Sequence, residues 1–158
     1  MTYPRFLAMI ATSTIVMFGL MYLNSYAFSH VRFSEIRVYM AVGMGAVMAV
    51  IMLLFMREMY RNRRLNLAIV GASLLIFAVS LSLVRSQVTV QDVSWMRAMI
   101  PHHSIAILTS ERAGISDPRV RRLADEIIEA QRLEIAEMEA LIADLQGGAP
   151  ATPEIDGQ

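Results

Sequence analysis

Three long apolar segments dominate the first half of the chain and restrict the folds that it can adopt. They span residues 6–28, 38–56 and 65–84, and none of them contains an acidic or basic side chain. A helix of about 20 apolar residues crosses the roughly 30 Å hydrocarbon core of a bilayer. Inside lipid the backbone polar groups must be paired within the protein, which a helix achieves by itself. The sequence therefore predicts three transmembrane helices in a membrane domain over residues 1–85.

The charged residues divide the chain at Arg85. The part up to Arg85 carries eight arginines and two acids, a formal charge of +6, whereas the rest carries six arginines and twelve acids, a formal charge of −6. The two parts are therefore expected to face different surroundings. We expect no nucleic-acid partner, because the basic residues lie at the edges of apolar segments and the polar part is acidic. The chain also has no cysteine, so disulfides and thiolate metal sites are excluded.

The orientation in the membrane is predicted from arginine. Residues 57–64 contain four arginines, and short loops rich in Arg remain on the cytoplasmic side. This predicts a bacterial inner (cytoplasmic) membrane protein with a cytoplasmic N-terminus and a periplasmic C-terminal part. An alternative for the first apolar segment is a signal peptide cleaved after Ala27, because Ser25-Tyr26-Ala27 is a small-x-small triplet.

After Arg85 the sequence predicts an extracytoplasmic helical hairpin over residues 86–146. Its first helix is expected to begin at a capping box formed by Thr89 and Asp92 and to run to about Ala113. Pro101 lies inside this helix and predicts a kink or a break, because it removes one intrahelical hydrogen bond.

The second polar helix has a clear beginning. Asp117 is a good N-cap, and Pro118 suits the first helical position. The helix is expected to run to about Leu145 and to end at two glycines, and residues 147–158 are predicted to be a disordered tail.

One face of the first polar helix carries sulfur and nitrogen donors. With about 100° between successive residues, Met96, Met99 and His103 fall on the same face, and His102 lies on its flank. These residues are the candidate metal ligands of the helix.

The second polar helix carries an apolar seam with alternating four-three spacing. The expected seam consists of Val120, Ala124, Ile127, Gln131, Glu134, Met138, Leu141 and Leu145. Gln131 and Glu134 interrupt it, and a buried polar side chain needs a hydrogen-bond partner. We expect the two histidines of the first helix to be these partners.

Thioether and imidazole donors without thiolates suit the soft ion Cu(I), and by extension Ag(I). Zinc would be better served by more His or Cys, and a ferritin-like di-iron site would need Glu-x-x-His pairs, which the chain lacks. The residues alone leave a second interpretation open, in which the histidines and the Gln/Glu pair satisfy one another inside a metal-free helical bundle.

Two strings of residues resemble a known family. The first is M-x-x-M-I-P-H-H, from Met96 to His103, and the second is Q-x-x-E-I-x-x-M, from Gln131 to Met138. Together they resemble the family called domain of unknown function 305 over about residues 90–145. The resemblance implies a ferritin-like four-helix-bundle fold and copper handling of the CopM type. It also implies Met96, Met99, His102, His103 and Met138 as ligands, with Gln131 and Glu134 beside them.

The chain departs from the family in two ways. Many members have a further methionine near the position of Leu108-Thr109, which is absent here, and the full domain has four helices where this chain offers two. A homodimer or a higher oligomer could complete the bundle, and so could an extension of the third membrane helix.

Methionine also recurs inside the second apolar segment, at Met40, Met44, Met48, Met52 and Met56. This strict four-residue spacing produces a slowly winding stripe on a helix. Packing and lipid contact are the simple interpretation, and a copper permease with a thioether ladder is the alternative. Beside the stripe, Ala41, Gly45 and Ala49 form a ridge suited to close helix contact.

The sequence thus predicts an all-α protein in which three transmembrane helices precede an antiparallel two-helix ferritin-like module. The leading hypothesis is a membrane-anchored periplasmic protein that sequesters Cu(I) or Ag(I), or hands it to a copper-handling partner. A metal-free interaction or assembly module is the alternative. We expect no enzyme, because there is no activated nucleophile and no open hard-metal site.

Overall fold

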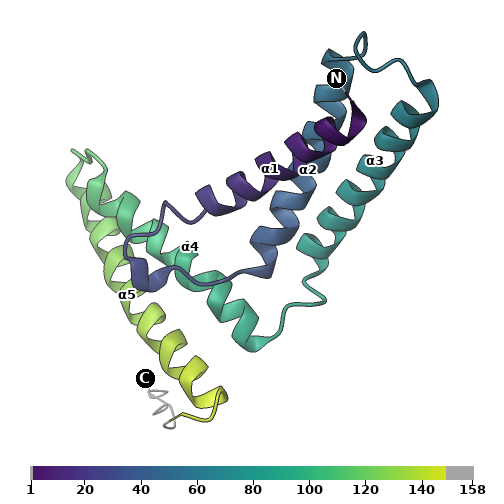
Figure 1. Cartoon of the computed structure of the whole chain (residues 1–158). Coiled ribbons are helices and arrows are strands. Elements are labelled where there is room, and N and C mark those ends of the chain that lie inside the picture. The colour runs from purple at the N-terminus through teal and green to yellow at the C-terminus, as the bar shows by residue number, and fades with distance from the viewer. Residues whose placement is uncertain (1, 149–158) are drawn as a thin grey trace. The chain divides into compact units, whose positions relative to one another are not determined.

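The structure, a computed structural model, describes residues 2–148, and all regular elements in this range are helices (Figure 1). They are α1 (Tyr3–Leu20), the short 3₁₀ helix η1 (Phe28–His30), α2 (Glu35–Phe55), α3 (Arg63–Ser86), α4 (Asp92–Arg112) and α5 (Pro118–Leu145). The predicted all-α class is confirmed. The predicted disordered tail lies outside the described residues from 149 onward.

Internal contacts divide the chain into two compact units. The first, here called the apolar unit, comprises residues 1–23 and 35–90, and the second, the hairpin unit, comprises residues 24–34 and 91–158. The segment between the first two apolar helices therefore belongs with the hairpin, whereas the predicted domain boundary placed it in the membrane domain.

The apolar unit contains three helices that are long and apolar enough to cross a membrane, with 18, 21 and 24 residues. The helix α1 ends at Leu20, although the apolar segment continues to Phe28. The chain turns after Met21, because the residues that follow make hydrogen bonds outside the helix: the Tyr26 N–H donates to the Ser104 hydroxyl at 2.7 Å. That contact lies wholly within the hairpin unit.

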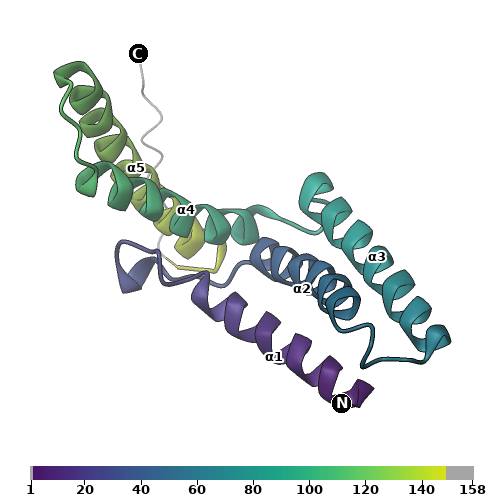
Figure 2. The same ribbon diagram turned by 90° about the horizontal axis from the view of Figure 1, so that it is seen from above.

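Within the apolar unit, α2 lies between α1 and α3 (Figure 2). The predicted small-residue ridge of Ala41, Gly45 and Ala49 is buried, which confirms its role in helix contact. A Cβ atom added at Gly45 would clash with the Thr14 side chain of α1. Small residues thus allow the two backbones to approach closely.

The connection from α3 to α4 differs from the prediction. The helix α3 ends at Ser86, and Gln87 adopts a left-handed conformation with φ of 53°. The predicted capping box does not form, because α4 begins at Asp92 and its N-cap, Gln91, makes no side-chain cap bond. Thr89 lies 2.9 Å from the Tyr39 hydroxyl instead, and this hydrogen bond satisfies its Oγ1.

In the hairpin unit, α4 and α5 pack as an antiparallel pair joined by residues 113–117 (Figures 1 and 2). The helix α4 runs from Asp92 to Arg112 without a break at Pro101. The helix α5 begins as predicted, with the Asp117 carboxylate accepting from the Arg119 N–H at 2.8 Å. The guanidinium of Arg119 also bonds this carboxylate and lowers the pKa of Asp117 below its usual value.

The predicted seam of α5 is correct at Ala124 and Met138 and wrong by one position at Ile127, Glu134 and Leu141. Its buried residues are Ala124, Ile128, Ile135 and Met138. Ile127 and Leu141 are both 37% exposed, whereas their neighbours Ile128 and Ile142 pack in the core. Adjacent apolar pairs on α5 make both stripes similar in sequence, so the sequence alone did not determine which stripe faces α4.

We predict that Gly45→Leu destabilises the apolar unit, because the added side chain would push α1 away from α2. Overpacking of this kind costs about 1–3 kcal/mol. The change is measured as a lower melting temperature of the purified protein in detergent. Gly71→Leu is the matched control, since no atom lies within 4 Å of a Cβ at Gly71. Equal melting temperatures for the two variants would contradict the close packing at Gly45.

Candidate metal centre

The buried face of α4 is built by residues at helical spacing. Met96, Ile100, His103 and Ile107 lie three or four positions apart, so they share one side of the helix. This side packs against Ile128, Ile135 and Met138 of α5 in one core cluster. The predicted donor face of α4 is therefore the face that contacts the second helix.

Three methionines of the predicted site belong to this core cluster or pack against it. The side chains of Met96 and Met138 are 4% and 6% exposed, and Met99 is partly buried against the same cluster. Two of them come from α4 and one comes from α5. The structure thus brings together thioethers that are about 40 residues apart in the sequence.

His103 is the polar member of the same interface. Its Nε2 lies 2.6 Å from Glu134 Oε2, and its Nδ1 lies 3.0 Å from the carbonyl oxygen of Met99. The side chain of Gln131 donates to the same Glu134 oxygen at 3.2 Å. The expected meeting of His103 with Gln131 and Glu134 is confirmed as a hydrogen-bonded chain. Its role beside a metal ion stays a prediction.

His102 does not join this group. Its side chain is exposed, and its ring centroid lies 6.1 Å from that of His103. The flank position predicted from helix geometry is therefore observed. Of the five predicted ligands, four lie in the interface between the helices and His102 lies outside it.

The donor set fits a soft ion better than a hard one. Among residues 2–148 there is no group of three or more His, Asp or Glu side chains that could hold a metal ion. The donors at this interface are the thioethers, one imidazole and the Glu134 carboxylate hydrogen-bonded to it, and of these the thioethers and the imidazole suit Cu(I) and Ag(I). A hydrogen bond from Nδ1 to a backbone carbonyl, as at Met99, is the arrangement that orients the other ring nitrogen of a ligating histidine.

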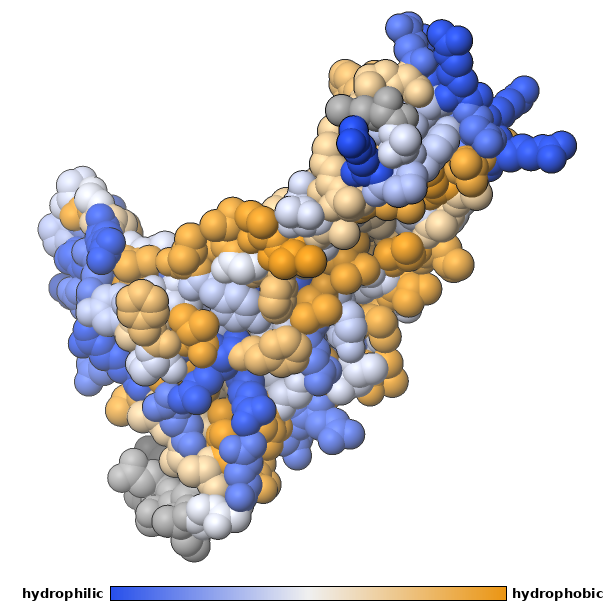
Figure 3. All heavy atoms as spheres, in the orientation of Figure 1, coloured by the Kyte–Doolittle hydropathy of each residue, from blue (hydrophilic) through white to orange (hydrophobic). Residues whose placement is uncertain are grey.

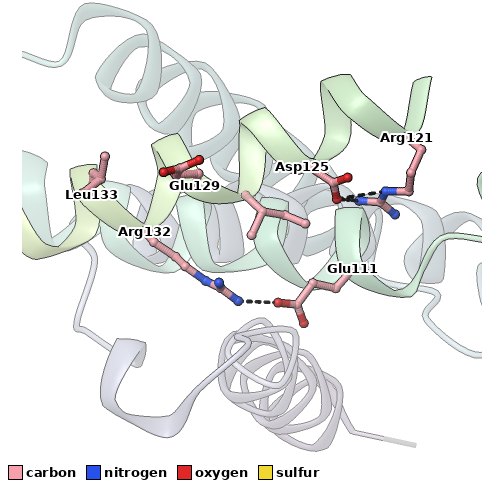
Figure 4. A pocket seen from close by; sticks show the side chains of 7 residues that line it. Glu111, Arg121, Asp125, Glu129, Arg132 and Leu133 are labelled. Atoms are coloured by element: carbon pink, nitrogen blue, oxygen red, sulfur yellow. Dashed lines mark hydrogen bonds and ion pairs between the residues drawn. The ribbon is translucent and has the colours of Figure 1, made fainter. Parts of the chain in front are cut away.

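A surface cavity of the hairpin unit is a different feature. It measures about 740 Å³ and is lined by five charged side chains of α4 and α5 together with Ile128 and Leu133 (Figure 4). Arg132 pairs with Glu111 at 2.6 Å and Arg121 pairs with Asp125 at 2.7 Å. None of the predicted metal ligands lines this cavity, so it is separate from the candidate metal centre.

Comparison with known proteins identifies the hairpin. Residues 82–154 match the sequence model of the family described as domain of unknown function DUF305. This confirms the resemblance that the two strings indicated. The chain is also 39% identical over 61 residues to an uncharacterized protein of Acanthamoeba polyphaga mimivirus. The match covers 37% of this chain and 40% of the viral protein, and no solved structure matches.

Sequence analysis missed the residues that attach the segment 24–34 to the DUF305 hairpin. Ser104 is fully buried, and its hydroxyl accepts from the Tyr26 N–H and lies 3.0 Å from Nδ1 of His30. Arg32 forms an ion pair with Glu139 of α5 at 3.0 Å. The sequence offered no local signal for these contacts, because Ser104 lies about 100° around the helix from His103 and its partners are distant in the sequence.

The methionine stripe of α2 faces two different environments. Met40 and Met44 line an apolar groove with Phe77 of α3. Met52 and Met56 pack against the cluster that contains Phe6 and other residues at the start of α1. A four-residue step advances about 40° around the helix, which explains why the stripe leaves one neighbour and reaches another.

We predict that Ser104→Ala destabilises the hairpin unit, because it removes the hydroxyl that accepts from the Tyr26 N–H in a partly buried hydrogen bond. A hydrogen bond of this kind contributes about 0.5–1.5 kcal/mol. The change is measured as earlier thermal unfolding and as faster proteolysis within residues 24–34. Ser110→Ala is the matched control on the same helix, since Ser110 is only partly buried. Unchanged proteolysis in Ser104→Ala would contradict this attachment.

Proposed function

We propose that this protein is a membrane-anchored metal-binding protein whose DUF305 hairpin sequesters Cu(I) or Ag(I), or hands the ion to a partner. The observation that carries this proposal is the convergence of Met96, Met99, Met138 and His103 in one interface. These donors are soft and have no thiolate competitor in the chain. The ion is the cargo of the protein in this proposal.

The proposed binding step exchanges one partner of His103. The Nε2 atom would release its proton to solvent by way of the exposed Glu134 carboxylate and then bind the ion with its free lone pair, while Nδ1–H stays at the Met99 carbonyl oxygen. Exposed His102, beside His103, would receive the ion from solvent and deliver it. Thioethers are neutral ligands, so the ion brings its charge into an apolar interface and Glu134 remains close enough to offset it. Release to a partner would reverse this exchange.

The proposed location is the bacterial inner membrane, with the hairpin on the periplasmic side. The three long apolar helices support a membrane location, and the arginines of residues 57–64 support a cytoplasmic position for the α2–α3 loop. The lipid bilayer is then one partner of the protein. A second copy of the chain is another, because Val120, Leu123 and Leu145 leave apolar surface exposed on α5.

The second candidate is a metal-free interaction or assembly module. It is supported by the hydrogen bonding of His103, because both ring nitrogens already face oxygen acceptors inside the hairpin. In this alternative the His-Glu-Gln chain fixes the register of two helices. No catalytic role is proposed for either candidate.

A Cu(I) competition titration of the purified full chain tests the leading proposal. We predict that Met99→Leu combined with His103→Gln weakens Cu(I) affinity by about 100-fold or more, since even an outer partner of a metal ligand contributes about 10- to 100-fold. His102→Gln alone is the control and should change the uptake rate more than the affinity. Weak binding by the unaltered protein, with a lower melting temperature for the double variant, would favour the metal-free module.

The permease alternative makes a separate prediction. If the methionines of α2 carry Cu(I) across the membrane, proteoliposomes should show metal flux that Met44→Leu combined with Met48→Leu abolishes. Because the methionine stripe is divided between two environments, we expect no metal flux in the unaltered protein or in the double variant. Flux that the double change removes would overturn this expectation.

A further inference from the structure

One end of the apolar unit is held together by aromatic and amide side chains. The Tyr3 hydroxyl donates to Asn66 Oδ1 at 2.7 Å, and Asn66 Nδ2 donates to the Tyr60 carbonyl oxygen at 2.7 Å. The rings of Phe6 and Tyr60 meet at 5.3 Å, and both side chains are 1% exposed. The start of α1 and the α2–α3 loop therefore form one fixed platform.

This platform carries a dense positive charge. Five arginines belong to it and one acid, Glu58, so its formal charge is +4. The arginines are Arg5, Arg57, Arg61, Arg63 and Arg64. All five are exposed, and within residues 2–148 none of them forms an ion pair. Figure 3 shows strongly hydrophilic atoms gathered at this end of the apolar unit, next to hydrophobic surface.

The placement of these charges is unfavourable for the isolated helices. Arg5 lies in the first turn of α1, and Arg63 and Arg64 lie in the first turn of α3. Neither first turn contains an acid. A helix N-terminus is the positive end of the helix dipole, so basic side chains there are destabilising unless an anion neutralises them. The arginines of this platform are thus not explained by helix stability.

The surroundings of the arginines indicate which anion would fit. Phe55, Leu67 and Leu7 are 85%, 64% and 53% exposed within about two helical turns of the charged residues. Large apolar side chains at such exposure are stable where lipid covers them. The arginines then lie at the depth of the phospholipid headgroups. Arginine binds phosphate oxygens through two parallel hydrogen bonds, which suits this position.

We propose that this arginine platform is a binding site for the headgroups of anionic phospholipids, with their acyl chains against the neighbouring apolar residues. The proposal is independent of metal binding by the hairpin. It also goes beyond the role of arginine in orientation, because a topological signal acts during insertion and requires no bound lipid afterwards. A binding site, in contrast, retains anionic lipid in the purified protein.

The test uses the purified full chain in detergent micelles. Native mass spectrometry and thermal melting are measured with phosphatidylglycerol, with phosphatidylcholine and with inorganic phosphate at equal phosphate concentration. We expect phosphatidylglycerol to be retained and to raise the melting temperature more than the other two. Arg63→Gln combined with Arg64→Gln should weaken this binding about 25-fold, since each basic residue near an anionic surface contributes roughly a factor of five.

Three further variants make the result decisive. Arg63→Lys with Arg64→Lys keeps the charge but loses the paired hydrogen bonds to phosphate, so its binding should fall between that of the unaltered chain and that of the Gln variant. Arg112→Gln with Arg122→Gln removes two exposed arginines of the hairpin helices and should leave binding unchanged. If the first double variant loses helix content, Arg57→Gln with Arg61→Gln replaces it. Equal effects of the two lipids, an equal effect of inorganic phosphate, or unchanged binding after loss of the platform arginines would each overturn the proposal.

Discussion

The hydrogen bond between His103 Nε2 and Glu134 Oε2 is the directional contact on which the candidate metal centre depends. The core of the α4–α5 interface is largely apolar, and apolar contacts alone tolerate a shift of one helix along the other. Polar contacts at such an interface can fix its register. Two further contacts of this kind join the helices, between Arg132 and Glu111 and between Arg121 and the Ser110 carbonyl oxygen. The positions of Met96 and Met138 relative to each other follow from the register that these contacts fix.

Much of the fold followed from the sequence, and the reasons for the exceptions are specific. Uncharged segments of membrane length predicted the three apolar helices, and Asp117 followed by Pro118 predicted the start of α5. The capping box predicted at Thr89 does not form, because the Thr89 hydroxyl is hydrogen-bonded to Tyr39 of α2 and does not cap the helix. The seam of α5 was correct at Ala124 and Met138 and wrong where apolar residues occur in adjacent pairs, such as Ile127 and Ile128. Periodicity within one helix does not choose between two equally apolar stripes.

At the candidate site, too, relations within one helix could be predicted from the sequence, whereas most contacts with distant segments could not. Helix geometry placed Met96, Met99 and His103 on one face and His102 on its flank, because these relations lie within α4. The contact with Glu134 could be anticipated because a short connection makes the two helices antiparallel neighbours. The contacts of Ser104 could not, because they join α4 to a segment that precedes it by more than 70 residues. Pro101 did not break α4, where it is buried in the folded hairpin unit.

The path of the chain through its two units has a consequence for how such a protein can be divided. Residues 24–34 belong to the hairpin unit although they lie between two helices of the apolar unit. A cut after residue 90 would therefore separate residues 24–34 from the rest of the hairpin unit, and the Ser104 hydroxyl would lose its partners in that segment. The two units are interleaved along the sequence, so recombination that exchanges the hairpin helices alone must disturb the chain between α1 and α2.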